Sequence, residues 1–243
     1  GYIGIELLEA FVANNLKVNM LEKNFYILHL LDDDISKLIR NHIEENYSEF
    51  VTFYSNESAK SFKGEKRISK VITDSGIEID TDFVVIATGI LPNVEIFKKI
   101  GGKTSVHGTI SVNEYMQTSI DSIYAVGDCT DNLNLVTKKR SWIPLGSTAN
   151  KEGRVCALTI AGLDNGFEGV LGSMVTKFFS LTISSVGLTE KSAKDNGYEP
   201  ISATVTKKDK AGYMPEAKNI TVKLVADKNS KKILGAQAIG CGD

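Results

Sequence analysis

Apolar residues recur along the first part of the chain at spacings typical of helices and of buried strands. Residues 3–12 carry apolar side chains three and four positions apart, and the strand-like run Val18 to Glu22 follows after a short break. Residues 32–46 repeat the helical spacing, and their acidic first residues suit the positive end of a helix dipole. This pattern predicts a helix, a strand and a crossover helix, as in a parallel α/β sheet.

Shorter strand-like runs fill the segment that follows the second helix. The predicted strands are residues 51–54, 59–62, 68–73, 77–79 and 83–87. The middle three form a meander with a turn before Ile77, and the last is expected to be buried. Pro92 ends regular structure, so the chain can leave one domain for another there.

A continuous apolar run, Ile123 to Val126, stops abruptly at Gly127 and Asp128. The run predicts a strand buried on both faces, with a short strand at residues 109–112 before it and a polar loop after it. Ligands bind at the carboxyl ends of strands in open α/β sheets, so Asp128 is placed to accept hydrogen bonds from a ligand's hydroxyl groups. A plain Gly–Asp turn is the alternative when these residues are taken alone.

A further helix is predicted after the polar loop, from Ser147 as its N-cap to about Ala161. If the start of this helix faces the same crevice as Asp128, its partial positive charge suits an electron-rich ring. A simple capped helix is the alternative.

The last part of the chain changes character to an α+β unit with antiparallel strands. A short helix at residues 190–196 is surrounded by strands. The predicted strands are residues 175–179, 183–188, 201–206, 220–226 and 233–239. The chain ends in Gly-Cys-Gly-Asp without a closing helix, so we expect the C-terminus to be incomplete.

The first helix and strand match the later part of a dinucleotide-binding βαβ unit. Gly1 and Gly4 fit the second and third glycines of the GxGxxG fingerprint, and Glu22 lies eighteen residues after Gly4. An acid there accepts both ribose hydroxyls and repels a 2′-phosphate, which favours NADH over NADPH, although Lys23 weakens this preference. A surface helix followed by an ordinary strand is the alternative. The first glycine and its strand are missing, so we expect the sequence to be a piece of a longer polypeptide.

Composition narrows the function classes. The 243 residues carry a net charge of −2 with scattered lysines, which argues against nucleic acid or an anionic membrane as a partner. The sequence contains no apolar run of ~18 residues and no signal-peptide pattern, so we expect a cytoplasmic protein. The three cysteines, Cys129, Cys156 and Cys241, form no CxxC pair, so neither a disulfide framework nor a zinc or other metal site is predicted.

Five motifs occur in an order that resembles one enzyme family. They are Gly-Tyr-Ile-Gly-Ile-Glu at 1–6, Ala-Thr-Gly-Ile-Leu-Pro-Asn at 87–93, the segment 118–129, Pro-Leu-Gly-Ser-Thr-Ala-Asn at 144–150, and Leu-Thr-Ile-Ser-Ser-Val-Gly-Leu-Thr at 181–189. The chain resembles the flavin-dependent pyridine nucleotide-disulfide oxidoreductases, in the branch of NADH oxidases, NADH peroxidases and coenzyme A disulfide reductases. The resemblance covers essentially the whole chain.

The resemblance implies an α/β fold of three parts. Residues 1–90 would be a Rossmann-like NAD(P)-binding domain without its first strand, residues 91–166 the C-terminal part of an FAD-binding domain, and residues 167–243 an α+β interface domain that forms a homodimer.

The resemblance also implies two sets of cofactor contacts. The NAD site would be lined by Gly1, Ile3, Gly4, Glu22 and Gly89, with Glu6 near the nicotinamide. Asp128 would bind the flavin ribityl chain, and Leu145 and Gly146 would contact the isoalloxazine through their backbone.

Other positions add alternatives or departures. Tyr213 resembles an interface tyrosine that reaches the partner subunit's active site, with a packed interface aromatic as the alternative. Leu31 stands where some relatives have a nucleotide-contacting tyrosine. The family's redox-active cysteine lies in an N-terminal half that this sequence does not contain, so no catalytic residue is predicted.

The expected function follows from the resemblance. The parent protein would pass hydride from NAD(P)H to FAD and electrons on to a cysteine-based centre, and would reduce oxygen, peroxide or a small disulfide such as that of coenzyme A. The alternative is a non-catalytic fragment that binds nucleotide and dimerises.

Overall fold

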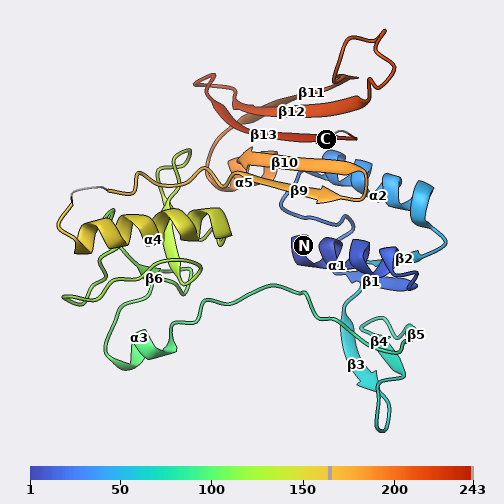
Figure 1. The fold of residues 1–243 in the computed structure, drawn as a ribbon, viewed down its shortest axis with the longest axis horizontal. Helices are drawn as coiled ribbons and strands as arrows, with labels where there is room; N and C mark the ends of the chain where they lie inside the picture. Colours follow the sequence, from blue (N-terminus) through green and yellow to red (C-terminus); the bar gives the residue numbers. More distant parts are fainter. Residues whose placement is uncertain (164–165, 242–243) are drawn as a thin grey trace. The chain divides into compact units, whose positions relative to one another are not determined.

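The structure is a computed structural model that describes residues 1–163 and 166–241. The chain divides into two units (Figure 1). Among the described residues, the first unit combines residues 1–89, 175–185 and 189–241, and the second combines residues 90–163, 166–174 and 186–188. None of the helices in the described residues is long and apolar enough to cross a membrane.

The first unit begins with a βαβ-like arrangement. Helix α1 (Tyr2–Ala13) buries Ile5, Leu8 and Val12, and strand β1 (Val18–Glu22) follows it. Helix α2 (Asp33–Tyr47) then leads to strand β2 (Val51–Ser55), which pairs with β1 in parallel. The predicted order of helix, strand, crossover helix and strand is confirmed.

An antiparallel meander follows β2. It contains β3 (Ala59–Lys63), β4 (Lys70–Thr73) and β5 (Glu78–Asp80), hydrogen-bonded in that order. Gly76 occupies the turn between β4 and β5 with a φ of 94°, a left-handed conformation that favours glycine. The predicted meander and its turn are confirmed.

The buried strand predicted at residues 83–87 is wrong. In the described chain these residues join no sheet, and Phe83 and Ile86 are 50% and 68% exposed. The parallel sheet of this unit consists of β1 and β2, and neither strand pairs with residues 83–87. The segment instead passes α1, where the ring of Phe83 lies edge-on to that of Phe11 with centroids 5.3 Å apart. An apolar run needs a neighbouring strand for its backbone groups, and composition does not reveal whether one is present.

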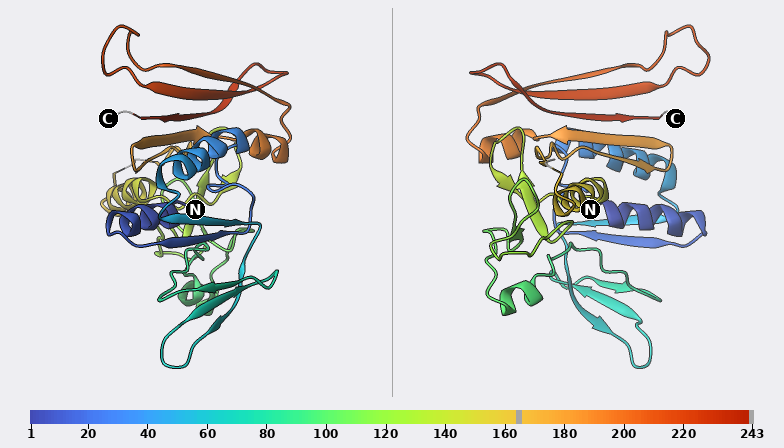
Figure 2. Two further views of the ribbon diagram at one scale, coloured as in Figure 1. Left: turned by 90° about the vertical axis from the view of Figure 1, so that its right-hand side faces the viewer. Right: turned by 60° about the vertical axis from the view of Figure 1, so that its left-hand side comes forward.

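A five-stranded sheet completes the first unit (Figure 2). Its strands, in the order β11-β12-β13-β10-β9, are Pro200–Lys208, Asn219–Asp227, Ile233–Gly240, Leu181–Gly187 and Met174–Phe178. Strands β11, β12 and β13 pair antiparallel. Helix α5 (Glu190–Asp195) starts with a capping box between Thr189 and Ser192. The predicted α+β arrangement is confirmed.

A buried ammonium group joins this sheet to two helix N-termini. Lys223 on β12 has a side chain only 5% exposed, and its Nζ lies 3.3 Å from Asp32, 2.7 Å from Asp34 and 2.9 Å from Glu190. Asp32 also exchanges two hydrogen bonds with Gln237 on β13: its N–H donates at 2.8 Å, and its carboxylate accepts from Nε2 at 2.7 Å. The starts of α2 and α5 are thereby fixed to β12 and β13.

The charges in this cluster support one another. Burial lowers the pKa of Lys223, but hydrogen bonds and charge from the surrounding carboxylates outweigh burial, so its pKa is raised above the ordinary value. Hydrogen bonds from Ser202 and Lys223 lower the pKa of Glu190. The ammonium and the Glu190 carboxylate therefore both remain charged at neutral pH.

The second unit is built on a small mixed sheet and one long helix. Strand β6 (Ile110–Ser111) pairs in parallel with β7 (Thr130–Leu133), and β8 (Arg140–Ser141) pairs antiparallel with β7. The helices are α3 (Glu95–Lys99) and α4 (Gly146–Ile160). The buried core residues are Val94, Phe97, Ile110, Val112, Met116 and Val155. The predicted strand near residue 110 and the helix ending near residue 161 are confirmed.

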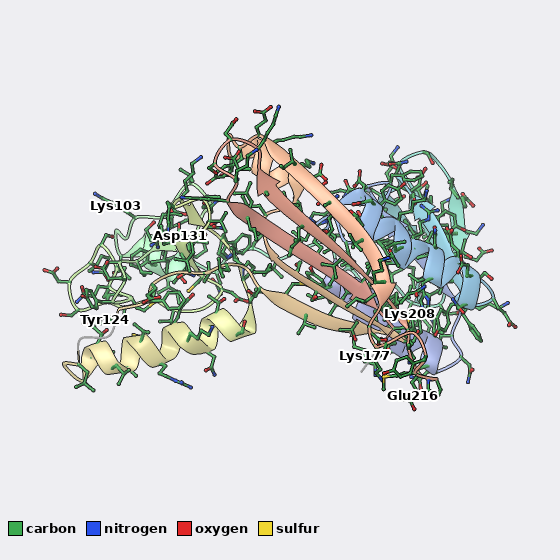
Figure 3. The ribbon with its side chains drawn as sticks, turned by 90° about the horizontal axis from the view of Figure 1, so that it is seen from above. Lys103, Tyr124, Asp131, Lys177, Lys208 and Glu216 are labelled. Carbon is green, nitrogen blue, oxygen red and sulfur yellow. The ribbon has the colours of Figure 1, made fainter. Side chains whose placement is uncertain are left out.

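The strand predicted from Ile123 to Val126 is wrong. This run is half-buried against the core and makes a single isolated bridge, between Tyr124 (Figure 3) and Gln117. The backbone turns sharply just before the run, where Ser122 has a φ of 64°. The apolar side chains of this irregular segment pack against the core, so their partial burial does not require pairing with another strand.

The regular strand instead follows Asp128, where a polar loop was predicted. Strand β7 was missed because its buried side chains are polar: Thr130, Asp131 and Asn132. Hydropathy assigns such residues to loops, but here they hydrogen bond inside the unit to Glu152 and Arg140. Asp131, labelled in Figure 3, is fully buried.

Two further expectations concern the start of α4 and the C-terminus of the chain. Ser147 is not the N-cap of α4, because the helix starts at Gly146 with Leu145 as N-cap and without a side-chain capping bond. The expected incomplete C-terminus rests on the last four residues, of which Gly242 and Asp243 lie outside the described residues.

The Lys223 cluster yields a stability prediction. In Lys223→Met the three carboxylates lose their shared counter-charge, so the free energy of unfolding should fall by about 3–5 kcal/mol, measured by urea denaturation. Lys228→Met is the matched control, because Lys228 forms an exposed ion pair with Glu199 at 3.0 Å, and it should cost less than about 1 kcal/mol. Equal losses in the two variants would contradict the role of Lys223.

Candidate functional site

The residues predicted to bind NAD lie in the first unit, around the start of α1. Gly1 is the N-cap of α1 without a side-chain capping bond, so N–H groups of the first turn have no partner within the helix. Ile3 in this turn is exposed. A methyl group at Gly4 would lie 3.6 Å from Met20 Cε and 4.0 Å from Ala87 Cβ, so α1 packs directly on β1 at this point.

Glu22 ends β1 on the side of this helix start. Gly4 in the first turn of α1 packs against Met20, which stands two residues before Glu22 on the same strand. The Oε1 atom of Glu22 accepts hydrogen bonds from the backbone N–H and the side-chain amide of Asn24, both at 3.1 Å. The structure therefore places the first turn of α1 beside the strand that ends at Glu22.

The other predicted nucleotide contacts are placed less directly. Glu6 is exposed on α1, and its Oε1 accepts a hydrogen bond from Thr176 on β9 at 3.3 Å. Gly89 has a φ of 130°, a conformation that disfavours any side chain, and the space around its missing Cβ is open. Leu31 is buried, so its side chain belongs to the core of this unit. The roles of these residues stay predictions.

The residues predicted to bind the flavin gather in the second unit, at the N-terminus of α4. Gly127 has a φ of 83°, and a methyl group there would lie 3.6 Å from the Cβ of Ala149 in the first turn of α4. The carbonyl of Asp128 accepts a hydrogen bond from Trp142 Nε1 at 2.8 Å. Asp128 is exposed, so its carboxylate is accessible beside the helix start.

Leu145 and Gly146 form that helix start. The carbonyl of Leu145 accepts the first intrahelical bonds, from Thr148 at 2.9 Å and Ala149 at 3.0 Å. Gly146 is exposed, and a Cβ added to it would meet no atom within 4 Å. The backbone N–H groups of this turn are thus presented at a surface that a planar ring could approach.

Sequence reasoning missed the residue that holds this arrangement. Glu152 on α4 is only 1% exposed, and its carboxylate accepts hydrogen bonds from the Gly127 N–H, from Thr130 Oγ1 at 2.9 Å and from Asn132 Nδ2 at 2.7 Å. It fixes the turn before Asp128 to the helix. The available signal was its position four residues after Thr148, on the buried face of α4.

Cys129 and Cys156 do not resemble activated thiols. Cys129, Cys156 and Cys241 are free. Burial raises the pKa of Cys129 and of Cys156, which keeps both thiols protonated and weakly nucleophilic. Among the described residues, no cluster of three or more His, Cys, Asp or Glu side chains is arranged to hold a metal ion.

Tyr213 lies in the hairpin between β11 and β12 and is 90% exposed. Lys208, labelled in Figure 3, ends β11, and Glu216, also labelled there, lies in the connection to β12. An exposed aromatic at a hairpin tip is available to another molecule, so its role at an interface stays a prediction.

Comparison with protein families gives two matches. Residues 1–153 match the model described as pyridine nucleotide-disulphide oxidoreductase. Residues 173–242 match the model described as pyridine nucleotide-disulphide oxidoreductase, dimerisation domain.

Individual relatives agree with these matches. The NAD(P)H sulfur oxidoreductase (CoA-dependent) of Pyrococcus furiosus is 40% identical over 240 residues, which are 99% of this chain and 53% of the relative. The NADH oxidase of Methanocaldococcus jannaschii is 32% identical over 241 residues, 99% of this chain and 52% of the relative. The chain thus spans about half the length of the curated relatives it matches.

Solved structures show the same fold. An NAD-dependent persulfide reductase from A. fulgidus superposes with a TM-score of 0.95 at 35% identity, over 100% of this chain and 44% of the other. The reduced CoADR-RHD of Bacillus anthracis superposes with a TM-score of 0.94 at 32% identity, over 100% of this chain and 43% of the other.

The Glu152 network yields a second stability prediction. Glu152→Ala leaves the Gly127 N–H and the Asn132 amide without their acceptor, whereas the Thr130 hydroxyl can still donate to the Gly127 carbonyl at 2.8 Å. The free energy of unfolding should therefore fall by about 3–5 kcal/mol. The environment of Trp142, the chain's single tryptophan, should change with it, because Trp142 bonds the adjacent Asp128 carbonyl. Denaturation followed by tryptophan fluorescence measures both effects.

Glu95→Ala is the control for this measurement. Glu95 forms an exposed ion pair with Lys98 at 3.1 Å on α3, so its loss should cost less than about 1 kcal/mol. If Glu152→Ala were as stable as Glu95→Ala, with unchanged fluorescence, Glu152 would not hold the turn.

Proposed function

The chain belongs to the pyridine nucleotide-disulphide oxidoreductase family, as its motifs predicted, and from that premise we propose that it is part of a flavoprotein oxidising NAD(P)H. Hydride passes to FAD, and electrons pass on to a cysteine-based centre. The observation that carries the proposal is the uncapped first turn of α1, whose Gly4 packs against Met20 on β1, the strand that ends at Glu22.

At the nucleotide site the chain's own groups bind and select. The first-turn N–H groups of α1 and the positive end of its dipole favour the pyrophosphate near Gly1 and Gly4. Glu22 accepts hydrogen bonds from the adenosine ribose hydroxyls and repels a 2′-phosphate, so the site prefers NADH. Ile3, Gly89 and Glu6 complete the site, with Glu6 toward the nicotinamide.

At the flavin site the residues around α4 fit the cofactor. Asp128 has an accessible carboxylate to accept the ribityl hydroxyls, and Leu145 and Gly146 present backbone groups to the isoalloxazine. The positive end of the α4 dipole favours negative charge on the ring. The bound flavin supplies the acceptance of hydride and the delivery of single electrons or electron pairs.

For the electron acceptor we favour a small sulfur compound over oxygen or peroxide. The relative named NAD(P)H sulfur oxidoreductase, from Pyrococcus furiosus, is 40% identical to this chain, whereas the NADH oxidase from Methanocaldococcus jannaschii is 32% identical. A disulfide such as that of coenzyme A, or a related persulfide, belongs to this class.

We also propose that the protein is a cytoplasmic homodimer that associates through residues 167–243. The match of residues 173–242 to the dimerisation domain supports this assignment. The proposed domains are residues 1–90 for NAD(P), residues 91–166 for FAD and residues 167–243 for the interface.

A non-catalytic fragment that binds nucleotide and dimerises is the second candidate. Its support is the uncapped first turn of α1 together with the match of residues 173–242 to the dimerisation domain. The absorbance spectrum of the purified chain separates the two candidates, because a flavin band in the visible supports the enzyme and its absence supports the fragment.

Nucleotide selectivity tests the proposal at Glu22. Glu22→Ala should weaken NADH binding by roughly tenfold or more, because a charge-assisted hydrogen bond is worth about 1.5–3 kcal/mol. NADPH should lose less, since the same change removes repulsion of its 2′-phosphate. Titration of each nucleotide followed by fluorescence measures the two dissociation constants. Equal losses of NADH and NADPH affinity would contradict the assignment of Glu22 to the ribose.

Flavin content tests the proposal at Asp128. Asp128→Asn keeps the shape of the side chain but removes its charge and part of its acceptor capacity, so flavin retention should fall sharply. Cys129→Ser and Cys156→Ser are the controls and should retain flavin that NADH can reduce. Flavin per protomer is measured in the flavin-containing protein after gel filtration. Normal content in Asp128→Asn, or loss of reduction in Cys129→Ser, would overturn this account.

A further inference from the structure

The carboxylate of Glu22 is held in one orientation before any ligand binds. Glu22 is half-buried at the end of β1, and both donors of Asn24, the backbone N–H and the side-chain amide, lie 3.1 Å from its Oε1. A carboxylate offers about four acceptor positions on two oxygens. Two donors on Oε1 leave Oε2 directed away from Asn24 with its acceptor positions for a ligand.

The backbone that carries Asn24 is itself fixed to the end of β2. The Glu22 carbonyl accepts from the Glu57 N–H at 3.1 Å, and the Asn24 carbonyl accepts from the Asn56 N–H at 3.3 Å. Asn24 therefore cannot follow Glu22 if that side chain swings away. The bonds restrain Glu22 relative to a rigid frame.

An arginine fixes the next residue of the same loop. Arg40 on α2 donates to the Phe25 carbonyl at 3.1 Å and to Ser55 Oγ at 2.6 Å. Its guanidinium also lies over the rings of Phe25 and Phe53, 5.3 and 5.5 Å from their centroids. The loop after β1 is thus held on both sides of Asn24.

We propose that Asn24 is a positioning residue that fixes the Glu22 carboxylate for the adenosine ribose and thereby sets the preference for NADH over NADPH. This inference rests on the proposed nucleotide site. A Glu22 held in place meets the ribose hydroxyls without losing rotamer freedom on binding. A released Glu22 can instead turn toward solvent or toward the exposed Lys23, which weakens NADH binding and reduces repulsion of a 2′-phosphate.

The two nucleotides therefore respond differently to the loss of the Asn24 amide. In Asn24→Ala the backbone N–H remains but the side-chain donor is gone. The NADH dissociation constant should rise about three- to tenfold, the range expected when one side chain must be ordered on binding. The NADPH dissociation constant should stay unchanged or fall. A general loosening of the loop would weaken both nucleotides together.

Three further variants separate positioning from folding. Asn24→Asp keeps the shape but replaces the amide donor with a second negative charge, so its NADH affinity should fall further than that of Asn24→Ala. Asn24→Ser restores a short donor and should recover part of the affinity. Asn46→Ala is the matched control, because this exposed amide on α2 bonds the His42 carbonyl at 2.8 Å and has no bond to Glu22.

The deciding experiment is a double-mutant cycle in the full-length protein, with NADH and NADPH dissociation constants measured by titration calorimetry. We expect the effect of Asn24→Ala on NADH to vanish in the Glu22→Ala background. An effect that persists there, or an equal loss for both nucleotides, would overturn the role of Asn24 and leave the nucleotide site standing. Failure of the unaltered protein to bind either nucleotide would instead refute the proposed function.

Discussion

Burial of charge with a complete set of partners is the constraint on which both units depend. In the first unit the ammonium of Lys223 lies within 3.3 Å of three carboxylates that come from the starts of α2 and α5. Such a group is costly to bury unless its partners arrive in the right geometry. The five-stranded sheet and α2 must therefore pack in one register. That register also fixes where α2 and its Arg40 meet the loop after β1.

Glu152 plays the corresponding part in the second unit. A carboxylate that is 1% exposed needs donors, and Gly127, Thr130 and Asn132 supply them from one short stretch of chain. The stretch is drawn onto α4, which places Asp128 beside the N-terminus of the helix. The position of the proposed flavin ligand thus follows from a buried acid that contacts no ligand itself.

Sequence patterns predicted most of the elements because their signals are local. The helices and strands of the first βαβ-like segment and of the five-stranded sheet follow period and turn chemistry, and both agree with the structure. The failures at residues 83–87 and at Ile123 to Val126 share a cause. Both are apolar runs. An apolar sequence predicts burial or contact, but it does not indicate whether a neighbouring strand is present to pair with.

The missed strand β7 shows the reverse limit. Its buried residues are polar, and their burial is offset by hydrogen bonds to Glu152, on another element, and to Arg140 on the neighbouring strand β8. Hydropathy is a property of a single residue, whereas a hydrogen bond to a buried polar group requires both a donor and an acceptor. The positions of Gly1, Gly4, Glu22 and Asp128 could be named from motifs, but the side chains that orient them could not.

The acids of this chain differ in how much acceptor capacity the fold leaves to them. Glu152 accepts three hydrogen bonds from the chain and is 1% exposed, so its acceptor capacity is used within the fold. Asp128 is exposed and accepts no side-chain hydrogen bond within the described residues, so all of its acceptor positions are available. Glu22 stands between them, with one oxygen bonded to Asn24. A carboxylate in that intermediate state is both accessible and oriented, and these are the two properties that discrimination between a hydroxyl and a phosphate requires.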